Sequence, residues 1–134
     1  MAAILTLDRP RRTPEEAGEE TGLDFYVIAL AMRDPGCREV VEDAVFLIAE
    51  EVARLPALLG ARENGRLAAA AERIADLAWE VGFTALARVA QDLRRLAEAA
   101  TPGAALAAVS ARLKRLADAL AAHHASEAPH SPGH

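Results

Sequence analysis

Apolar residues recur at intervals of three and four along most of this chain, which is the spacing of one face of an α-helix. Four long stripes of this kind occur, within about 37–59, 65–81, 84–99 and 102–121. Their members are Val41, Ala44, Ile48, Val52, Leu55 and Leu59; Leu67, Ala71, Ile74, Leu77, Ala78 and Val81; Leu86, Val89, Ala90, Leu93, Leu96 and Ala97; and Leu106, Val109, Leu113, Leu116 and Leu120. The pattern predicts four amphipathic helices.

Shorter signals between these stripes predict how the helices begin and end. The apolar run "DFYVIALAM" predicts a short additional helix that starts with Asp24 as its N-cap and stops at "RDPG". Asn64 is the expected N-cap of the helix over 65–81, and Gly82 is the expected C-terminal stop. Short turns favour antiparallel neighbours, so we expect an all-α fold: an antiparallel up-and-down four-helix bundle with a short extra N-terminal helix.

The two ends of the chain differ in composition from the bundle. Residues 1–22 mix Pro, Gly and charge, which predicts an N-terminal extension with at most a turn or two of helix. The bundle is expected over residues 23–121, and the polar, Pro-rich residues 122–134 are predicted to be a disordered tail. The apolar "AILTL" at residues 3–7 is expected to pack onto the bundle, with dimerisation through this segment as the alternative.

Composition and charge narrow the class of protein. The chain has 134 residues, 52% of them hydrophobic and 4% aromatic, which suits one domain with a core of Ala, Leu and Val. Twenty acidic residues against 15 Lys and Arg argue against nucleic-acid binding, since phosphate contacts need a basic face. No run of about 18 apolar residues predicts a membrane span, and no secretory segment is recognised at the N-terminus, so a cytoplasmic location is expected.

Residues that could hold a metal or act as nucleophiles are few. His123 and His124 have no Cys or carboxylate cluster at ligand spacing, and no Glu-x-x-His pairs occur on the predicted helices, so we predict no metal and no cofactor. Both histidines are interpreted as part of a solvated tail at the frayed end of the last helix. The single cysteine, Cys37, cannot form an internal disulfide and is interpreted as a small residue that fills a packing gap.

The order of these segments resembles a histidine-containing phosphotransfer (Hpt) domain over roughly residues 23–121. The most distinctive part is "ARENGRLAAAAERIADLAWEVGFTALARVAQDL". The family signature is a His on the third helix, then a leucine-like residue at plus two, Lys at plus three, Gly at plus four, a small residue at plus six and Gly at plus ten. Gly82 matches the terminal Gly, which places Glu72 at the His position, with Ile74 and Ala78 matching at plus two and plus six.

The resemblance implies a four-helix bundle that passes phosphate between receiver domains of bacterial two-component phosphorelays. Three functional positions are nevertheless substituted here, with Glu72 for His, Ala75 for Lys and Asp76 for Gly. A carboxylate lacks the nucleophilicity of imidazole, alanine cannot offset phosphoryl charge, and Asp76 adds bulk and negative charge. We therefore predict a pseudo-phosphotransfer signalling protein that is not an enzyme.

The remaining activity would be binding to a receiver domain or histidine kinase through the face of the third helix. The candidate residues are Arg66, Ala69, Glu72, Arg73, Ala75, Asp76 and Trp79. Trp79 is either a partner anchor or a cover over the turn at Gly82 and Phe83. Glu72 either imitates a phosphorylated His or is a solvated carboxylate paired with Arg73 or Arg66.

Two other functions fit the same sequence. An active phosphotransfer protein could use another group, such as His123 or His124. A structural bundle could dimerise through "AILTL" or its Ala-rich faces and have no phosphorelay role. We expect a monomer rather than a homodimer.

Overall fold

The computed structural model describes residues 14–127, and within that range it contains five helices and no strand. Their bounds are Pro14–Ala31 (α2), Pro35–Gly60 (α3), Asn64–Val81 (α4), Thr84–Glu98 (α5) and Gly103–Glu127 (α6). The all-α prediction is therefore confirmed. The "AILTL" segment at 3–7 lies outside the described residues.

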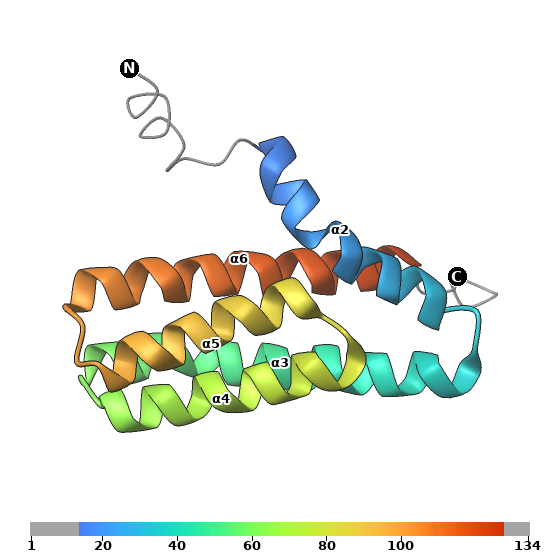
Figure 1. The fold of residues 1–134 in the computed structure, drawn as a ribbon. Helices are drawn as coiled ribbons and strands as arrows, with labels where there is room; N and C mark the ends of the chain where they lie inside the picture. Colours follow the sequence, from blue (N-terminus) through green and yellow to red (C-terminus); the bar gives the residue numbers. More distant parts are fainter. Residues whose placement is uncertain (1–13, 128–134) are drawn as a thin grey trace, which may run out of the picture.

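Helices α3, α4, α5 and α6 lie side by side along the long direction of the molecule (Figure 1). Helix α3 packs against α4 and α6, and α5 packs against the same two helices. Helix α2 lies at the end where α4 turns into α5, and contacts α3, α5 and α6 (Figure 1). These contacts are compatible with a four-helix bundle that carries one additional helix.

The buried residues follow the predicted stripes closely. Leu55, Leu67, Ile74, Leu93 and Leu113 are among the fully buried side chains, and every member of the four stripes is buried or half-buried. Leu59, Leu77, Val81, Leu96 and Val109 are the half-buried members, and they pack against the same core. One continuous core therefore joins all five helices, because Ile28 and Ala31 of α2 also belong to it.

Helix α2 is longer than the sequence predicted. It begins at Pro14, so the segment 14–22, expected to hold at most a turn or two, is part of an 18-residue helix. Asp24 therefore lies inside the helix and is not its N-cap. Extending an existing helix costs much less than nucleating one. Contacts made by Ile28 and Ala31 anchor the helix, which then continues through Gly18 and Gly22.

Helix α6 also exceeds its predicted end. It runs to Glu127, so residues 122–127 are helical and the predicted disordered tail is wrong over that part, while 128–134 lie outside the described residues. The ring of His123 stacks on Phe25 of α2, with centroids 4.4 Å apart and planes at 20°. His123 and His124 are both half-buried, which corrects their interpretation as a solvated tail. This contact with α2 supplies the packing that the sequence pattern does not reveal.

The two ends of α4 confirm its predicted C-terminal stop and correct its predicted N-cap. Gly82 ends α4 in the left-handed conformation, with φ +86°, as the sequence predicted. Helix α4 begins at Asn64 itself, and the preceding residue, Glu63, makes no side-chain capping bond, so Asn64 is not the cap. Helix α3 is capped by Asp34, whose carboxylate accepts a 3.0 Å hydrogen bond from the Gly36 amide. None of the helices in 14–127 is both long and apolar enough to cross a membrane.

Candidate interaction surface on helix α4

The outer face of α4 consists of side chains three and four residues apart that point away from the core. Arg66, Ala69, Glu72, Arg73, Asp76 and Trp79 are all exposed. We call these six residues the α4 outer face. The opposite side of the helix carries Leu67, Ala71, Ile74 and Ala78, which are fully or almost fully buried and fix the rotation of α4 about its axis. Six of the seven residues predicted for partner binding therefore lie together on one exposed surface.

Ala75 is the exception, because its side chain is only 3% exposed. The prediction that Ala75 belongs to the binding surface is wrong. Helix α4 packs against both α3 and α5, and its small residues Ala68, Ala70 and Ala75 are all buried. Small side chains let neighbouring helices approach closely, so more of the circumference of α4 is covered than its Leu and Ile positions alone indicate.

The arginines of the outer face pair with partners other than Glu72. Arg73 makes two hydrogen bonds of 3.1 Å to the carboxylate of Glu51 on α3, and Arg66 lies 3.7 Å from Glu63. The expected pairing of Glu72 with either arginine is therefore wrong. The Arg73–Glu51 pair is partly exposed, so it contributes at most about 1 kcal/mol to stability, but it orients the Arg73 side chain toward α3 and away from Glu72.

Trp79 keeps 44% of its side chain exposed, although Phe83, four residues later, is completely buried. Trp is enriched at the centres of protein interfaces, which makes this exposed ring a candidate anchor for a partner. Trp79 lies on the same exposed face as Glu72 and Asp76. The outer face thus combines one aromatic side chain with two carboxylates that have no ion-pair partner among residues 14–127.

Asp24 has a structural role that sequence reasoning missed. Its carboxylate is fully buried and accepts hydrogen bonds from the amides of Ala85, at 3.3 Å, and Leu86, at 3.1 Å. Phe83, at the N-cap position of α5, makes no side-chain capping bond. Asp24 therefore caps α5 from a different helix and ties α2 to the turn that follows α4. The only signal in the sequence is a single acidic residue in front of a run of apolar ones.

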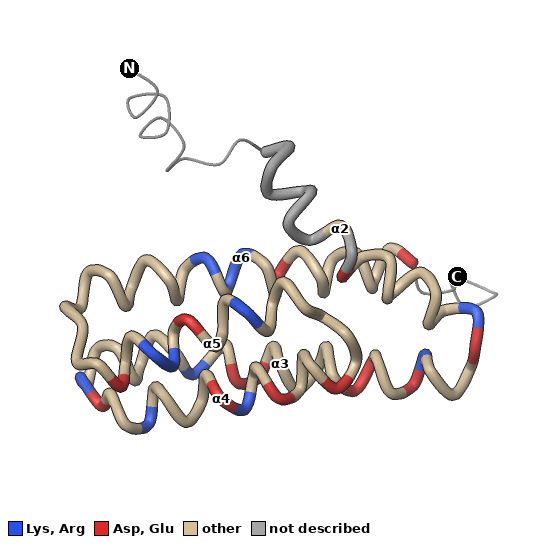
Figure 2. Tube along the Cα trace, viewed as in Figure 1, with Lys and Arg blue, Asp and Glu red and all other residues tan. Residues whose placement is uncertain are grey.

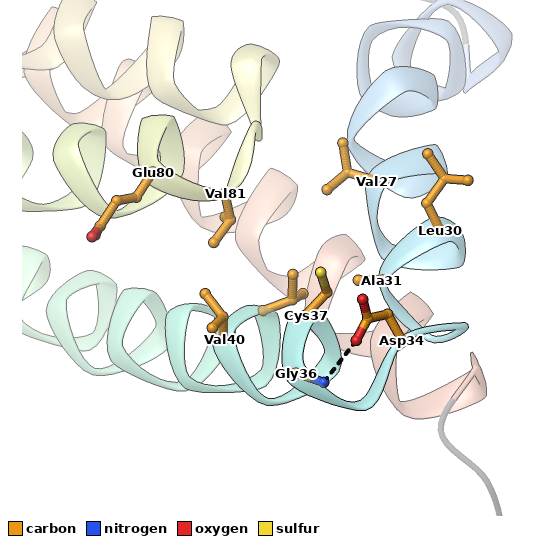
Figure 3. Close-up of a pocket in the computed structure, with 10 residues that line it drawn as sticks. Val27, Leu30, Ala31, Asp34, Gly36, Cys37, Val40, Glu80 and Val81 are labelled. Carbon is orange, nitrogen blue, oxygen red and sulfur yellow. Dashed lines mark hydrogen bonds between the residues drawn. The ribbon is translucent and has the colours of Figure 1, made fainter.

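A groove between α3 and α4 was also missed. One hollow at its α2 end is lined by Val27, Leu30, Cys37, Val40 and Glu80, among others (Figure 3). A second hollow is lined by Leu47, Asp76, Leu77 and Glu80, among others. Because Glu80 lines both, the two hollows adjoin. The spacing of seven between Val40 and Leu47 is the sequence signal that could have revealed a second, outward apolar stripe on α3.

Cys37 lies in this groove as an exposed free thiol. The interpretation of Cys37 as a small residue filling a packing gap is therefore wrong. It belongs to the first turn of α3, where the core stripe has not yet begun, since Val41 is the first buried residue of this helix. Pro35 and Gly36 in the same turn are exposed as well.

Charge is distributed unevenly over the helices. Helices α3 and α4 together contain eight Asp and Glu residues and four arginines (Figure 2). Helices α5 and α6 carry six Lys and Arg against four acidic residues. The side of the molecule that contains the α4 outer face and the groove is therefore the acidic side.

The acidic side presents carboxylates, arginines, the Trp79 ring and the Cys37 thiol. No group of three or more His, Cys, Asp or Glu side chains suited to a metal ion occurs in the described part of the chain. The six residues of the α4 outer face include no hydroxyl, thiol or imidazole nucleophile. Comparison with protein-family models, with curated proteins and with solved structures found no match to this chain.

Proposed function

We propose that this protein is a signalling module that resembles an Hpt domain, has lost phosphotransfer, and acts by binding a receiver domain or histidine kinase through the α4 outer face. In this proposal α3–α6 form an antiparallel four-helix bundle, and the protein works as a monomer. The observation that carries it is the composition of the exposed face. Glu72 occupies the position of the phosphorylated His, ten residues before the left-handed Gly82.

The surroundings of Glu72 support the loss of phosphotransfer. Ala75, which stands where the family has Lys, is buried, so this position presents no cation beside a phosphoryl group. Asp76 is exposed one turn after Glu72 and adds a second negative charge to the same face. Two neighbouring carboxylates repel a phosphoryl group, whereas they leave protein binding possible.

The alternative phosphotransfer sites receive less support from the structure. His123 is half-buried and stacked on Phe25, and His124 is half-buried beside it in the chain. A phosphoryl acceptor needs a freely accessible imidazole nitrogen, because the donor aspartyl phosphate lies in a receiver pocket. Incubation with a phosphorylated receiver should therefore leave no acid-labile label on the protein. Transfer of label to any residue would contradict the proposal that this protein does not take part in phosphotransfer.

Binding can be measured with the protein's own fluorescence, because Trp79 is its single Trp. Titration with a panel of receiver and histidine-kinase domains should give one partner that shifts the Trp79 emission. Trp79→Ala, measured by calorimetry, should weaken that partner at least tenfold, the effect of losing an interface anchor. Phe46→Ala is the matched control, since Phe46 is a similarly exposed aromatic residue on α3.

Charge reversal gives a second pair of variants. Asp76→Arg should change the affinity for the partner several-fold, because it inverts the charge beside Glu72. Glu98→Arg on α5 is the control, since it alters net charge equally at an exposed position on another helix. Absence of binding to every receiver and kinase domain tested would count against the proposed function.

A further inference from the structure

Several apolar side chains along the groove between α3 and α4 stay exposed although the five helices are packed together. Val40 is 57% exposed, and Leu30 and Leu47 are also exposed. These residues, together with Leu77 and Glu80, define what we call the α3–α4 groove. Its hollow at the α2 end has a volume of 540 Å³, and the adjoining hollow has a volume of 360 Å³. Val27 and Leu30 on α2 close one end of it (Figure 3).

The apolar positions in the groove are spaced to receive a helix. Val40 and Leu47 are seven residues apart on α3, which corresponds to about 10.5 Å along a helix axis. A partner helix repeats its apolar side chains at the same two-turn interval, at positions i, i+4 and i+7. An extended strand, with its two-residue repeat, matches this spacing less well.

Carboxylates border the apolar positions. Asp34, Glu50, Glu51, Asp76 and Glu80 line the two hollows, against only Arg54 and Arg73. Glu51 is already paired with Arg73, and Asp34 caps α3, whereas Glu50, Asp76 and Glu80 have no ion-pair partner among residues 14–127. Apolar side chains flanked by carboxylates favour the binding of a partner whose own apolar residues are flanked by Lys or Arg. The same carboxylates disfavour the binding of anionic lipid or nucleic acid.

We propose that the α3–α4 groove binds a cationic amphipathic helix of another protein, with apolar residues at i, i+4 and i+7 and Lys or Arg on both flanks. The apolar residues fill the hollows beside Leu30, Val40 and Leu47, and the basic flanks pair with Glu50, Asp76 and Glu80. The lining of the groove shares Arg73 and Asp76 with the α4 outer face. A helix in the groove and a receiver domain on the outer face would therefore compete for Asp76, whereas Trp79 belongs to the outer face alone.

A designed peptide tests this inference on the full-length protein. The probe is an 18-residue helical peptide with Leu at the apolar positions and Lys and Arg on the flanks, and the matched peptide has Glu in place of each Lys and Arg. We expect the cationic peptide to bind at least tenfold more tightly than the acidic one, with affinity that falls as salt is raised. Equal binding of the two peptides would overturn the proposal.

Variants of the protein show where the peptide binds. Glu80→Lys and Leu47→Ser should each weaken the cationic peptide at least fivefold, because one removes a charge partner and the other an apolar contact. Glu98→Lys on α5 is the control for net charge and should change the affinity less than twofold. An equal loss in Glu98→Lys and Glu80→Lys would overturn the proposal, since it indicates non-specific attraction. Trp79→Ala should leave peptide affinity unchanged, which separates this test from that of receiver binding.

Two other occupants of the groove give distinct results. Residues 3–12, "AILTLDRPRR", combine apolar and basic side chains in this chain itself. If Leu5→Asp with Leu7→Asp in the full-length protein raises peptide affinity more than tenfold, the groove is a site for the chain's own N-terminal segment and the proposal fails. If the wild-type protein sediments as a dimer and Glu80→Lys as a monomer, the occupant is a second copy and the proposal likewise fails.

Discussion

Asp24 connects two helices that are far apart in the sequence. Its buried carboxylate takes the place of the missing side-chain cap of α5 and holds α2 against the turn at Gly82. A buried carboxylate is stable only when its hydrogen-bonding capacity is used, so this residue and the α5 amides depend on each other. This contact holds α2 against the first turn of α5.

Replacement of Asp24 should therefore be costly. We expect Asp24→Ala to lower the free energy of unfolding by about 2–3 kcal/mol, because hydrogen bonds to a charged acceptor are lost and two amides at the start of α5 lose their cap. The measurement is urea denaturation followed by circular dichroism. Asp34→Ala is the matched control, since it removes an exposed N-cap, and it should cost only about 1 kcal/mol. An equal loss in the two variants would contradict the role assigned to burial.

Gly82 allows a second comparison at single-residue scale. Its φ of +86° disfavours any side chain, and a Cβ there would lie 3.5 Å from Val27 Cγ2, which is ordinary contact. Gly82→Ala should therefore lower the free energy of unfolding by about 1–2 kcal/mol through backbone strain alone. Gly60→Ala is the control, because Gly60 is helical and has open space around it. Thermal unfolding should show no loss for Gly60→Ala, and a loss there equal to that of Gly82→Ala would contradict this explanation.

The exposure of single residues was predicted correctly where the helical spacing alone determines on which side of the helix a residue lies. Glu72, Asp76 and Trp79 are exposed as the periodicity indicated. Ala75 was misassigned because alanine occurs at buried and at exposed positions of this helix, as at Ala70 and Ala69, so its identity alone does not decide its burial. Arg73 was assigned the wrong partner because Glu51 is on another helix, and sequence spacing does not reveal which helix lies beside α4.

At the scale of elements, the last turns of α6 depend on a contact with α2. The stack of His123 on Phe25 occurs where the sequence pattern predicts only a frayed, polar end. Stacked ring pairs contribute about 0.5–1.5 kcal/mol beyond the area that they bury. The contact therefore stabilises the C-terminal turns of α6 and the adjoining part of α2 at once.

Removal of the stack should loosen both elements. His123→Ala should lower the free energy of unfolding by about 1 kcal/mol and increase amide hydrogen exchange in residues 120–127. Ser126→Ala is the control, because Ser126 is exposed in the same turns of α6 and makes no ring contact. Exchange that stays the same in His123→Ala and in Ser126→Ala would show that the stack does not hold this end of the helix.

At the scale of the whole molecule, one core serves all five helices. Phe83 is the largest fully buried side chain, and it lies with Val45 and Ile48 of α3 and with Ala117 and Leu120 of α6 around a packing gap that has no room for a water molecule. It therefore joins the turn between α4 and α5 to the opposite side of the molecule. A single shared core predicts that residues 24–127 unfold together rather than in parts.

Phe83→Ala should consequently destabilise the entire fold. We expect a loss of about 3–5 kcal/mol, the range for removing a buried aromatic side chain, and the Trp79 fluorescence and helical circular dichroism should change together during urea denaturation. Phe46→Ala, the same substitution at a position 62% exposed, should cost less than about 0.5 kcal/mol. If the two signals separate in the wild-type protein, the five helices do not share one core.

The hydrophobic pattern by itself determined four long helices, their inward faces and the stop at Gly82, because these depend on local periodicity and backbone conformation. It also placed six of the seven candidate binding residues on one exposed face. Only the tertiary structure decided the cap of α5 by Asp24, the full extent of α2 and α6, the burial of Ala75 and the groove beside Val40. Each of these depends on which helix lies next to which, and such contacts join residues whose separation in sequence carries no periodic signal.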